Sequence, residues 1–222
     1  MITRPTSRPT RVAKELVGLI GEPAPRARDK VRPSLDDADR RWLAASRMCL
    51  IATSDATGRC DVSPKGDPAG SLVHVLDHVT IAIAERPGNR RGAGYHNILA
   101  NPHAGLIFLV PGRSDTLRVN GRARLVADAP WFDALVVRGA RPVLALVVEI
   151  EEVFGHCAKS LIRGEVWHPE TWNPGAVLEV GATARARRAQ GFADEPEPGA
   201  TVTEVEEGQL AAYGIVGGVG LY

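Results

Sequence analysis

The sequence has 222 residues, of which 44% are hydrophobic and 24% are charged. That composition is typical of a soluble globular protein, and the length favours one domain with peripheral arms. The net charge is only +1, so no global field draws the protein to nucleic acid or to an acidic membrane, and no apolar run reaches membrane-spanning length. We therefore expect neither a nucleic-acid partner nor a membrane partner.

The cysteines and histidines indicate neither disulfides nor a metal site. Cys49, Cys60 and Cys157 are an odd and widely spaced set, which favours a reducing cytoplasm over a disulfide framework. The six histidines are scattered. His74 and His78 lie four residues apart, but in strand and turn context rather than on a helix, so we expect no metal site.

Three segments are predicted along the chain. Residues 1–33 are rich in arginine and proline, and form either an arm that packs on the body or on a partner subunit, or a partly disordered leader. Residues 34–170 are predicted to form the folded domain. Residues 171–222 turn to proline, glycine, alanine and charge, and are predicted as an extension that packs on this domain or on a partner, with one helix near 183–190.

The central domain is predicted to be mainly β with peripheral helices. Ser34 is expected to cap a helix that buries Leu35, Ala38, Trp42 and Leu43. Strands are predicted at 48–53, 60–63, 72–76, 79–84, 104–110, 115–126 and 143–150, and further helices at 92–100, 130–138 and 156–163. Hairpin-length links make consecutive strands antiparallel, and closure into a small closed or half-closed barrel would remove exposed edges.

Two of these strands carry a specific expectation about their surroundings. In strand 79–84, one face holds the small residues Thr80, Ala82 and Ala84, which would leave room for something to lie against it. Strand 143–150 is an almost unbroken apolar run, so it is expected to be covered on both faces.

The segment 63–67 reads Ser-Pro-Lys-Gly-Asp and predicts a phosphate contact. Lys65 supplies a point charge, Ser63 supplies a hydroxyl donor, and Gly66 lets the backbone come close to a ligand. The alternative is a surface turn in which Lys65 and Asp67 merely face solvent.

The segment 86–91 reads Arg-Pro-Gly-Asn-Arg-Arg and leads into the helix predicted from Gly92. Helix N-termini bind anions through backbone donors and the dipole, and guanidinium groups add bidentate geometry. Arg90 and Arg91 therefore predict a second anion contact. The alternative is a solvated basic turn.

Arg118, Arg122 and Arg124 share one face of the strand 115–126. Three arginines on one face predict a barrel rim, an interface or part of a ligand pocket, and we assign only Arg118 to the pocket.

His156, Lys159 and Arg163 would form one basic ridge at helical spacing, with Trp167 close behind; the alternative is an ordinary solvated face. Because all these basic segments are distant in sequence, one small barrel is not expected to collect them, whereas a dimer with a shared site would.

Taken in order, these segments resemble the pyridoxamine 5′-phosphate oxidase-related flavoproteins. The matching segments are 63–67, 85–91, 97–102, 117–123 and 156–159 with Trp167, and the resemblance covers about residues 36–170. It implies an antiparallel FMN-binding split β-barrel that forms a homodimer and holds FMN at the subunit interface.

The resemblance also implies a set of cofactor-binding residues. The strand that ends in Val62, Ser63, Pro64, Lys65 and Gly66 would line the flavin and reach its phosphate. Asn89, Arg90 and Arg91 would form the second phosphate contact, and Thr116 and Arg118 would run beside the ring system. His156 and Lys159 would come from the partner subunit, and Trp167 completes the set.

The implied function is an FMN-dependent oxidoreductase acting on an unidentified small molecule. The oxidase itself holds its substrate with a C-terminal segment that bears arginine and histidine, but residues 209–222 contain neither, which argues against vitamin B6 oxidation and favours a branch whose reaction is unassigned. The sequence singles out no catalytic acid or base. Non-catalytic binding of flavin, deazaflavin or haem, a sensor role, and an anion-binding barrel without a cofactor stay open as alternatives.

Overall fold

The computed structural model describes residues 12–88 and 90–174, which fall into two compact units divided between Val31 and Arg32. Asn89, the helix predicted near 183–190 and nearly all of the predicted extension 171–222 lie outside the described residues. None of the helices in the described part of the chain is long and apolar enough to cross a membrane.

The first unit contains two short helices, α1 (Ala13–Ile20) and α2 (Pro25–Arg28). The apolar side chains Leu16, Leu19 and Ile20 of α1 are 48%, 70% and 75% exposed. The apolar side chains of α1 are therefore not buried among the described residues of the unit.

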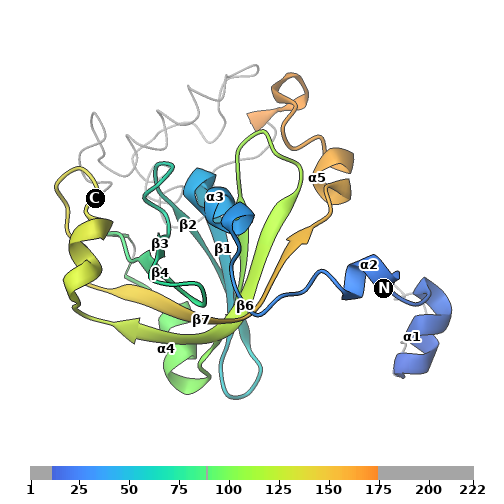
Figure 1. Ribbon diagram of the computed structural model, residues 1–222, viewed down its shortest axis with the longest axis horizontal. Helices are drawn as coiled ribbons and strands as arrows, with labels where there is room; N and C mark the ends of the chain where they lie inside the picture. Colours follow the sequence, from blue (N-terminus) through green and yellow to red (C-terminus); the bar gives the residue numbers. More distant parts are fainter. Residues whose placement is uncertain (1–11, 89, 175–222) are drawn as a thin grey trace, which may run out of the picture. The chain divides into compact units, whose positions relative to one another are not determined.

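The second unit is built on one sheet of seven antiparallel strands in the order β2-β1-β5-β6-β7-β4-β3. The strands are β1 (Met48–Ser54), β2 (Cys60–Gly66), β3 (His74–Val75), β4 (Thr80–Ala84), β5 (His103–Leu109), β6 (Thr116–Val126) and β7 (Ala145–His156). The helices are α3 (Asp37–Ala45), α4 (Ala93–Ala100), α5 (Lys159–Arg163) and two 3-10 helices, η1 (Pro130–Leu135) and η2 (Pro169–Thr171). The predicted antiparallel, mainly β class is confirmed, and Figure 1 shows the strands curving around a common interior.

Side chains close the sheet into a split barrel. β2 stands at one end of the strand order and β4 lies next to the other end. Nevertheless Lys65 in β2 pairs with Glu85, which directly follows β4, and Arg86 Nε lies 2.9 Å from Asp67 Oδ2. Two distant parts of the sheet therefore meet through ion pairs rather than through strand hydrogen bonds.

The hydrophobic core fills the inner face of this barrel. Phe108 on β5, Val119 on β6 and Ile81 on β4 are fully buried and belong to one cluster. The alternation predicted for 115–126 is confirmed, because Val119 and its neighbours at even spacing are buried. The inner face is thus apolar from β1 across to β4.

A second, smaller cluster corrects the prediction for strand 79–84. Ala82 and Ala84 are 0% and 2% exposed, so their small face is not open to a ligand. Ala84 instead packs with Phe132 and Leu135 of η1. The missing side-chain volume is filled by the protein itself.

The prediction for strand 143–150 is right at its centre and wrong at its start. Residues 145–148 are all buried, as expected for a strand covered on both faces. Val143 is 80% exposed and precedes the strand. β7 then continues to His156, beyond the predicted end.

Gly121 marks a bulge between β6 and β7. The register passes from Asn120 opposite Glu152 to Gly121 opposite Ile150, which leaves Glu151 as the extra residue. A Cβ atom on Gly121 would lie 1.9 Å from the carbonyl oxygen of Glu149. Only glycine permits this close approach of the two backbones.

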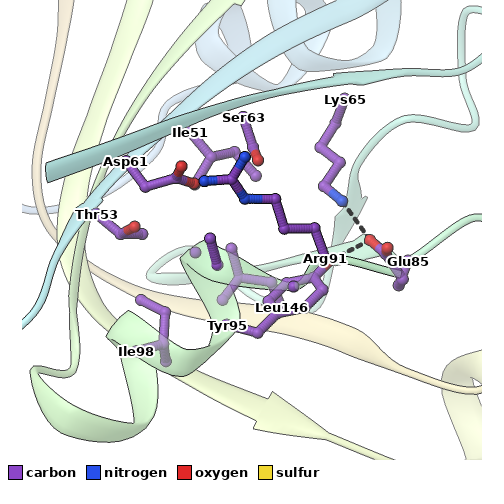
Figure 2. A pocket seen from close by; sticks show the side chains of 13 residues that line it. Ile51, Thr53, Asp61, Ser63, Lys65, Glu85, Arg91, Tyr95, Ile98 and Leu146 are labelled. Atoms are coloured by element: carbon purple, nitrogen blue, oxygen red, sulfur yellow. Dashed lines mark hydrogen bonds and ion pairs between the residues drawn. The ribbon is translucent and has the colours of Figure 1, made fainter. Parts of the chain in front are cut away.

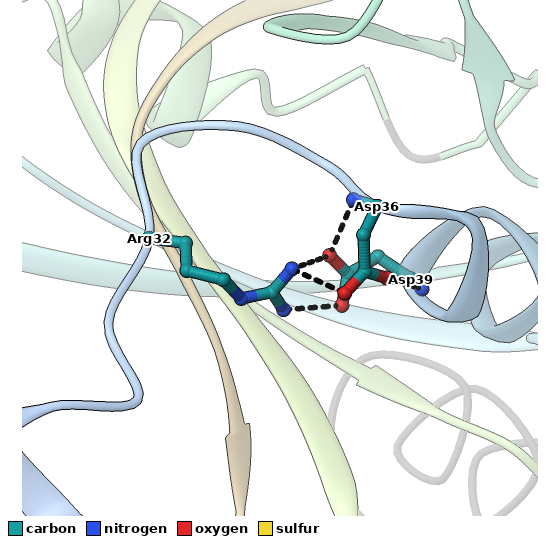
Figure 3. Close-up of polar contacts among 3 residues, drawn as sticks. All are labelled: Arg32, Asp36 and Asp39. Carbon is teal, nitrogen blue, oxygen red and sulfur yellow. Dashed lines mark hydrogen bonds and ion pairs between the residues drawn. The ribbon is translucent and has the colours of Figure 1, made fainter.

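α3 begins later than predicted, because Asp36 rather than Ser34 caps it. The Asp36 carboxylate accepts from the Asp39 amide, and Asp39 accepts from the Asp36 amide, which is a capping box with aspartate at both positions. Arg32 donates to both carboxylates (Figure 3). Of the predicted buried stripe, Leu35 and Leu43 are buried, Trp42 is half-buried and Ala38 is exposed.

The helix predicted over 130–138 is also shorter than expected. η1 ends at Leu135, and Val137 and Ala140 then pair as an antiparallel bridge. Arg138 and Gly139 between them have φ values of 50° and 79°. Positive φ at both positions is the geometry of a tight hairpin turn, so Gly139 closes a turn and does not end a helix.

Candidate functional site

The alternation of β2 sorts the predicted site residues onto two sides of the sheet. Asp61, Ser63 and Lys65 face the barrel interior, whereas Val62 and Pro64 are exposed on the outer face. The strand predicted at 60–63 is longer than expected, and the surface turn offered as the alternative for 63–67 is not formed at Pro64. β2 is an edge strand, where proline is tolerated, and it runs through to Gly66.

A pocket of about 120 Å³ opens on the inner side of β2. Its lining residues come from β1, β2, β7, the turn after β4 and the first turns of α4: Ile51, Thr53, Asp61, Ser63, Lys65, Glu85, Arg91, Gly92, Ala93, Gly94, Tyr95, Ile98 and Leu146. Figure 2 shows Asp61, Ser63 and Ile51 on one side of the pocket and Ile98, Tyr95 and Leu146 on the other, with the Arg91 side chain between them.

The N-terminus of α4 forms one wall of this pocket. Gly92 is its N-cap residue and adopts a left-handed conformation with φ of 58°, and no side chain in the described chain caps this end. Ala93 and Gly94 line the pocket. The partial positive charge of an uncapped helix N-terminus favours an anion.

Two asparagines fix α4 against β1. Asn97 Nδ2 donates to Thr53 Oγ1 and Asn101 Nδ2 donates to Ser54 Oγ, both over 3.0 Å. A Cβ atom on Gly94 would lie 3.5 Å from the same Thr53 hydroxyl. The helix start is thus held close to the strand that carries Thr53.

Lys65 and Glu85 are the first charged pair of the pocket. Lys65 Nζ pairs with Glu85 Oε2, and the Tyr95 hydroxyl donates to the same oxygen. The Lys65 ammonium also lies 5.0 Å from the centre of the Tyr95 ring. Burial, followed by the hydrogen bond to Glu85, raises the pKa of Tyr95 above its usual range.

Arg91 and Asp61 supply the other two charges. Figure 2 shows the Arg91 side chain reaching across the pocket with its guanidinium group directed toward Asp61. The lining therefore holds two cations and two carboxylates. The sequence reading identified the cations and missed the carboxylates.

Asp67 and Arg86 lie just outside this lining and play a structural part. Their side chains are only 3% and 12% exposed, and Arg86 Nε contacts both carboxylate oxygens. Burial raises the pKa of Asp67, against the lowering effect of Arg86. Lys65 and Asp67 do not face solvent, so that alternative for the segment 63–67 is wrong. In the segment 86–91, Arg86 is paired whereas Arg90 and Arg91 are exposed, so the solvated basic turn describes it in part.

The structure brings together only part of the predicted cofactor-binding set. Ser63, Lys65 and Arg91 line the pocket. Arg90 is exposed, has a φ of 58° and does not line it. Gly66 ends β2 beyond the lining.

The remaining predicted residues gather elsewhere. Thr116 pairs with His156 and Arg118 pairs with Phe154 across β6 and β7, so these side chains share the outer face. The Arg118 guanidinium lies 5.1 Å from the Phe154 ring centre, and its Nε is buried with no hydrogen-bond partner in the described chain.

The predicted basic ridge at 156–163 is wrong in its geometry. His156 is the last residue of β7, and α5 begins only at Lys159, because β7 stays paired with β6 as far as His156. Trp167 is not directed at a cofactor within this chain, since its indole N–H donates to the Arg113 carbonyl over 2.7 Å.

The outer face of the sheet links these residues to β2. One row across it runs Pro64, Leu50, Ile107, Arg118 and Phe154. The outer-face and pocket residues thus occupy opposite sides of the same strands. A single barrel cannot place both groups around one small ligand.

Glu85, Tyr95 and Asp61 are the pocket residues that sequence reasoning missed. Asp61 could have been predicted from the sequence, because strict alternation along β2 places it on the same side as Ser63 and Lys65. Glu85 and Tyr95 gave no local signal. Their roles depend on the barrel closure that brings β2 near the end of β4.

The amino-acid sequence matches the family model described as pyridoxamine 5′-phosphate oxidase over residues 35–157. The chain belongs to the pyridoxamine 5′-phosphate oxidase family. The match spans β1 to β7, and therefore both the pocket and the outer face. No curated protein matches the sequence.

Solved structures with a similar fold come from several bacteria. A candidate pyridoxamine 5′-phosphate oxidase of Lactobacillus delbrueckii shares 24% identity over 55% of this chain and 95% of its own, with a TM-score of 0.43. HupZ of Group A Streptococcus shares 19% identity over 55% and 94%, with a TM-score of 0.44. HutZ, the haem storage protein of Vibrio cholerae, shares 14% over 54% and 93%, with a TM-score of 0.37.

Proposed function

We propose that this protein is an FMN-binding oxidoreductase that acts on a small molecule, and that its inner pocket binds the phosphate of FMN. One observation carries the proposal: Lys65, Arg91 and the uncapped N-terminus of α4 converge on a single pocket within the family-matched region. Ammonium, guanidinium and helix-terminal amides are the donors that phosphate groups prefer.

The residues fit a phosphate in size as well as in chemistry. A pocket of about 120 Å³ is smaller than the roughly 300 Å³ at which sites for drug-sized ligands begin. Lys65 and Arg91 would neutralise the phosphate, and Ser63 would donate its hydroxyl to it. The isoalloxazine ring, which supplies the redox chemistry when FMN is bound, must then lie outside this pocket.

The outer face offers a surface for that ring in a homodimer. Leu50, Ala52 and Ile107 form an apolar strip there, and Val62 beside them is 60% exposed. The buried, unpaired Nε of Arg118 at its edge would have a polar ligand group as its partner. We propose that a second copy packs on this face, so that Thr116, Arg118, His156 and Lys159 border the flavin at the shared site.

The pocket lining supports a phosphorylated cofactor, and the cysteines bear on the location. The described pocket lining has no histidine, cysteine or methionine to ligate haem iron, which disfavours a haem within the pocket itself. Its two cations, Lys65 and Arg91, supply the charge that the phosphate of FMN would need. The free thiols Cys49, Cys60 and Cys157 agree with a reducing cytoplasm, which we propose as the location.

The test begins with the purified protein and FMN. We expect a yellow protein that retains added FMN through dialysis, whose flavin absorption is bleached by reductant and which oxidises NAD(P)H. Lys65→Met removes one phosphate contact and should retain less FMN through dialysis, whereas Arg41→Met, a control at an exposed position of α3, should retain as much as the wild type.

The outcomes separate the alternatives. A colourless protein that fails to retain FMN contradicts the proposal. Retention of a deazaflavin or of haem in place of FMN redirects it to that cofactor. Retained FMN without turnover of any electron donor supports a flavin carrier or sensor and contradicts the enzyme.

A further inference from the structure

Lys65, the cation best placed for a phosphate, is already engaged within its own chain. Its ammonium pairs with Glu85, and Tyr95 donates to the same carboxylate oxygen. The Lys65 and Glu85 side chains are 19% and 28% exposed, so water screens this pair less than it screens a surface pair. An entering anion therefore competes with Glu85 for Lys65.

We propose that Glu85 is a built-in counter-ion that competes with the phosphate for Lys65 and thereby sets the affinity of the pocket for phosphorylated ligands. This inference rests on the proposed function, because it takes the phosphate of FMN as the competing anion. Lys65 exchanges one charge-assisted hydrogen bond to a carboxylate oxygen for one to a phosphate oxygen. No covalent bond is made or broken.

Tyr95 makes this exchange possible. When Lys65 turns to the phosphate, Glu85 would otherwise become a half-buried carboxylate with no donor, which is costly. The Tyr95 hydroxyl donates to Glu85 in either state. Lys65 can also move toward the pocket while staying near the Tyr95 ring, whose centre is 5.0 Å from its ammonium.

The same lining supplies an internal control. Asp61 is a second carboxylate of the pocket, but it faces Arg91 rather than Lys65 (Figure 2). Replacing either carboxylate by its amide raises the net charge of the pocket by one. Only the Glu85 replacement releases Lys65, so a double-variant cycle separates direct competition from a general charge effect.

The experiment measures dissociation constants of FMN and riboflavin by quenching of flavin fluorescence, in the full chain. Glu85→Gln keeps the acceptor for Tyr95 and should tighten FMN roughly tenfold while leaving riboflavin unchanged, because riboflavin has no phosphate. Tyr95→Phe should weaken FMN, because Glu85 then holds Lys65 more strongly. In a Lys65→Met background, the Glu85→Gln effect should fall to the size of the Asp61→Asn effect, which measures the general charge contribution.

The results discriminate between this inference and the proposed function. If the wild-type protein binds FMN and Glu85→Gln binds it no more tightly, the counter-ion role is contradicted and the proposed function is not. A Glu85→Gln effect that keeps its full size in the Lys65→Met background also contradicts the counter-ion role. Failure of both wild-type and Glu85→Gln proteins to bind FMN contradicts the counter-ion role and the proposed function together. A thermal melt of each variant confirms that it is folded.

Discussion

At the scale of single residues, Tyr95 is the buried titratable group whose behaviour follows most directly from its surroundings. Burial and the negative charge of Glu85 both oppose formation of a phenolate, so the folded-state pKa lies above the ordinary value of about 10. A pKa raised on folding contributes stability below the unfolded-state value. That contribution is lost as the pH rises above about 10.

We therefore predict that Tyr95 stays protonated in the folded protein well above pH 10. The difference in tyrosinate absorbance between the wild type and Tyr95→Phe isolates this group among the three tyrosines of the chain. The difference should develop only where circular dichroism reports unfolding. Titration near pH 10 in the folded protein would contradict the buried Tyr95–Glu85 hydrogen bond.

Gly121 is the residue on which the β6–β7 pairing depends most strongly. Alanine there would place a Cβ atom 1.9 Å from the Glu149 carbonyl oxygen, so the backbones must separate. We predict that Gly121→Ala lowers the free energy of unfolding by about 3 kcal/mol, measured by urea denaturation. Gly155→Ala in β7, where a Cβ would meet nothing within 4 Å, should change it by less than about 1 kcal/mol; equal effects would argue against the bulge.

At the scale of elements, sequence patterns predicted where the strands lie better than they predicted which elements pack against them. Alternation located β6 and placed its arginines on one face, because the period of a strand depends only on local geometry. The face of Ala82 and Ala84 was misjudged, since a small side chain does not reveal that η1 packs against it. The N-terminus of α3 was placed at Ser34, because the sequence does not show that Arg32 and Asp39 complete a cap on Asp36.

α4 illustrates how an element positions the site without supplying its charges. The sequence predicted the helix, but its attachment through Asn97 and Asn101 required the strand partners Thr53 and Ser54, which lie far away in the chain. Fixing this helix sets the direction in which its N-terminal amides point into the pocket.

We predict that Asn97→Ala costs about 1 kcal/mol of stability and weakens FMN binding several-fold without removing any ligand contact. His96→Ala, at an exposed position of the same helix, should leave both quantities unchanged. Hydrogen exchange should show faster opening of α4 in the Asn97 variant alone. Equal effects of the two substitutions would mean that the asparagine does not hold the helix.

At the scale of the whole molecule, the residues that the family resemblance assigns to one cofactor site lie on two opposite sides of the sheet within one chain. Ser63, Lys65 and Arg91 line the pocket on the inner side of β2, whereas Thr116, Arg118 and His156 lie on the outer face of the sheet. The sequence indicated the residues of both groups but not that they lie on opposite faces. Which face becomes the interior depends on how the strands pair and how the barrel closes. We propose that a second copy of the chain brings the two groups together in a dimer.

We predict that the protein is a dimer in solution, with a mass by light scattering about twice the 23.7 kDa of the chain. Ala52→Glu places a charge in the middle of the outer apolar strip and should give a folded monomer that loses FMN. Val143→Asp, a control at an apolar position that is 80% exposed and off this face, should stay dimeric. A wild-type monomer that binds FMN fully would overturn the shared site.

The most direct test of the central claim is the ratio of the dissociation constants of riboflavin and FMN. If the pocket binds the phosphate through Lys65, Arg91 and α4, wild-type protein should prefer FMN by roughly a hundredfold or more, since charge-assisted hydrogen bonds contribute about 1.5–3 kcal/mol each. The ratio should fall at least about tenfold in Lys65→Met and stay unchanged in Arg41→Met. A wild-type protein that binds riboflavin as tightly as FMN would contradict the claim that this pocket holds the phosphate.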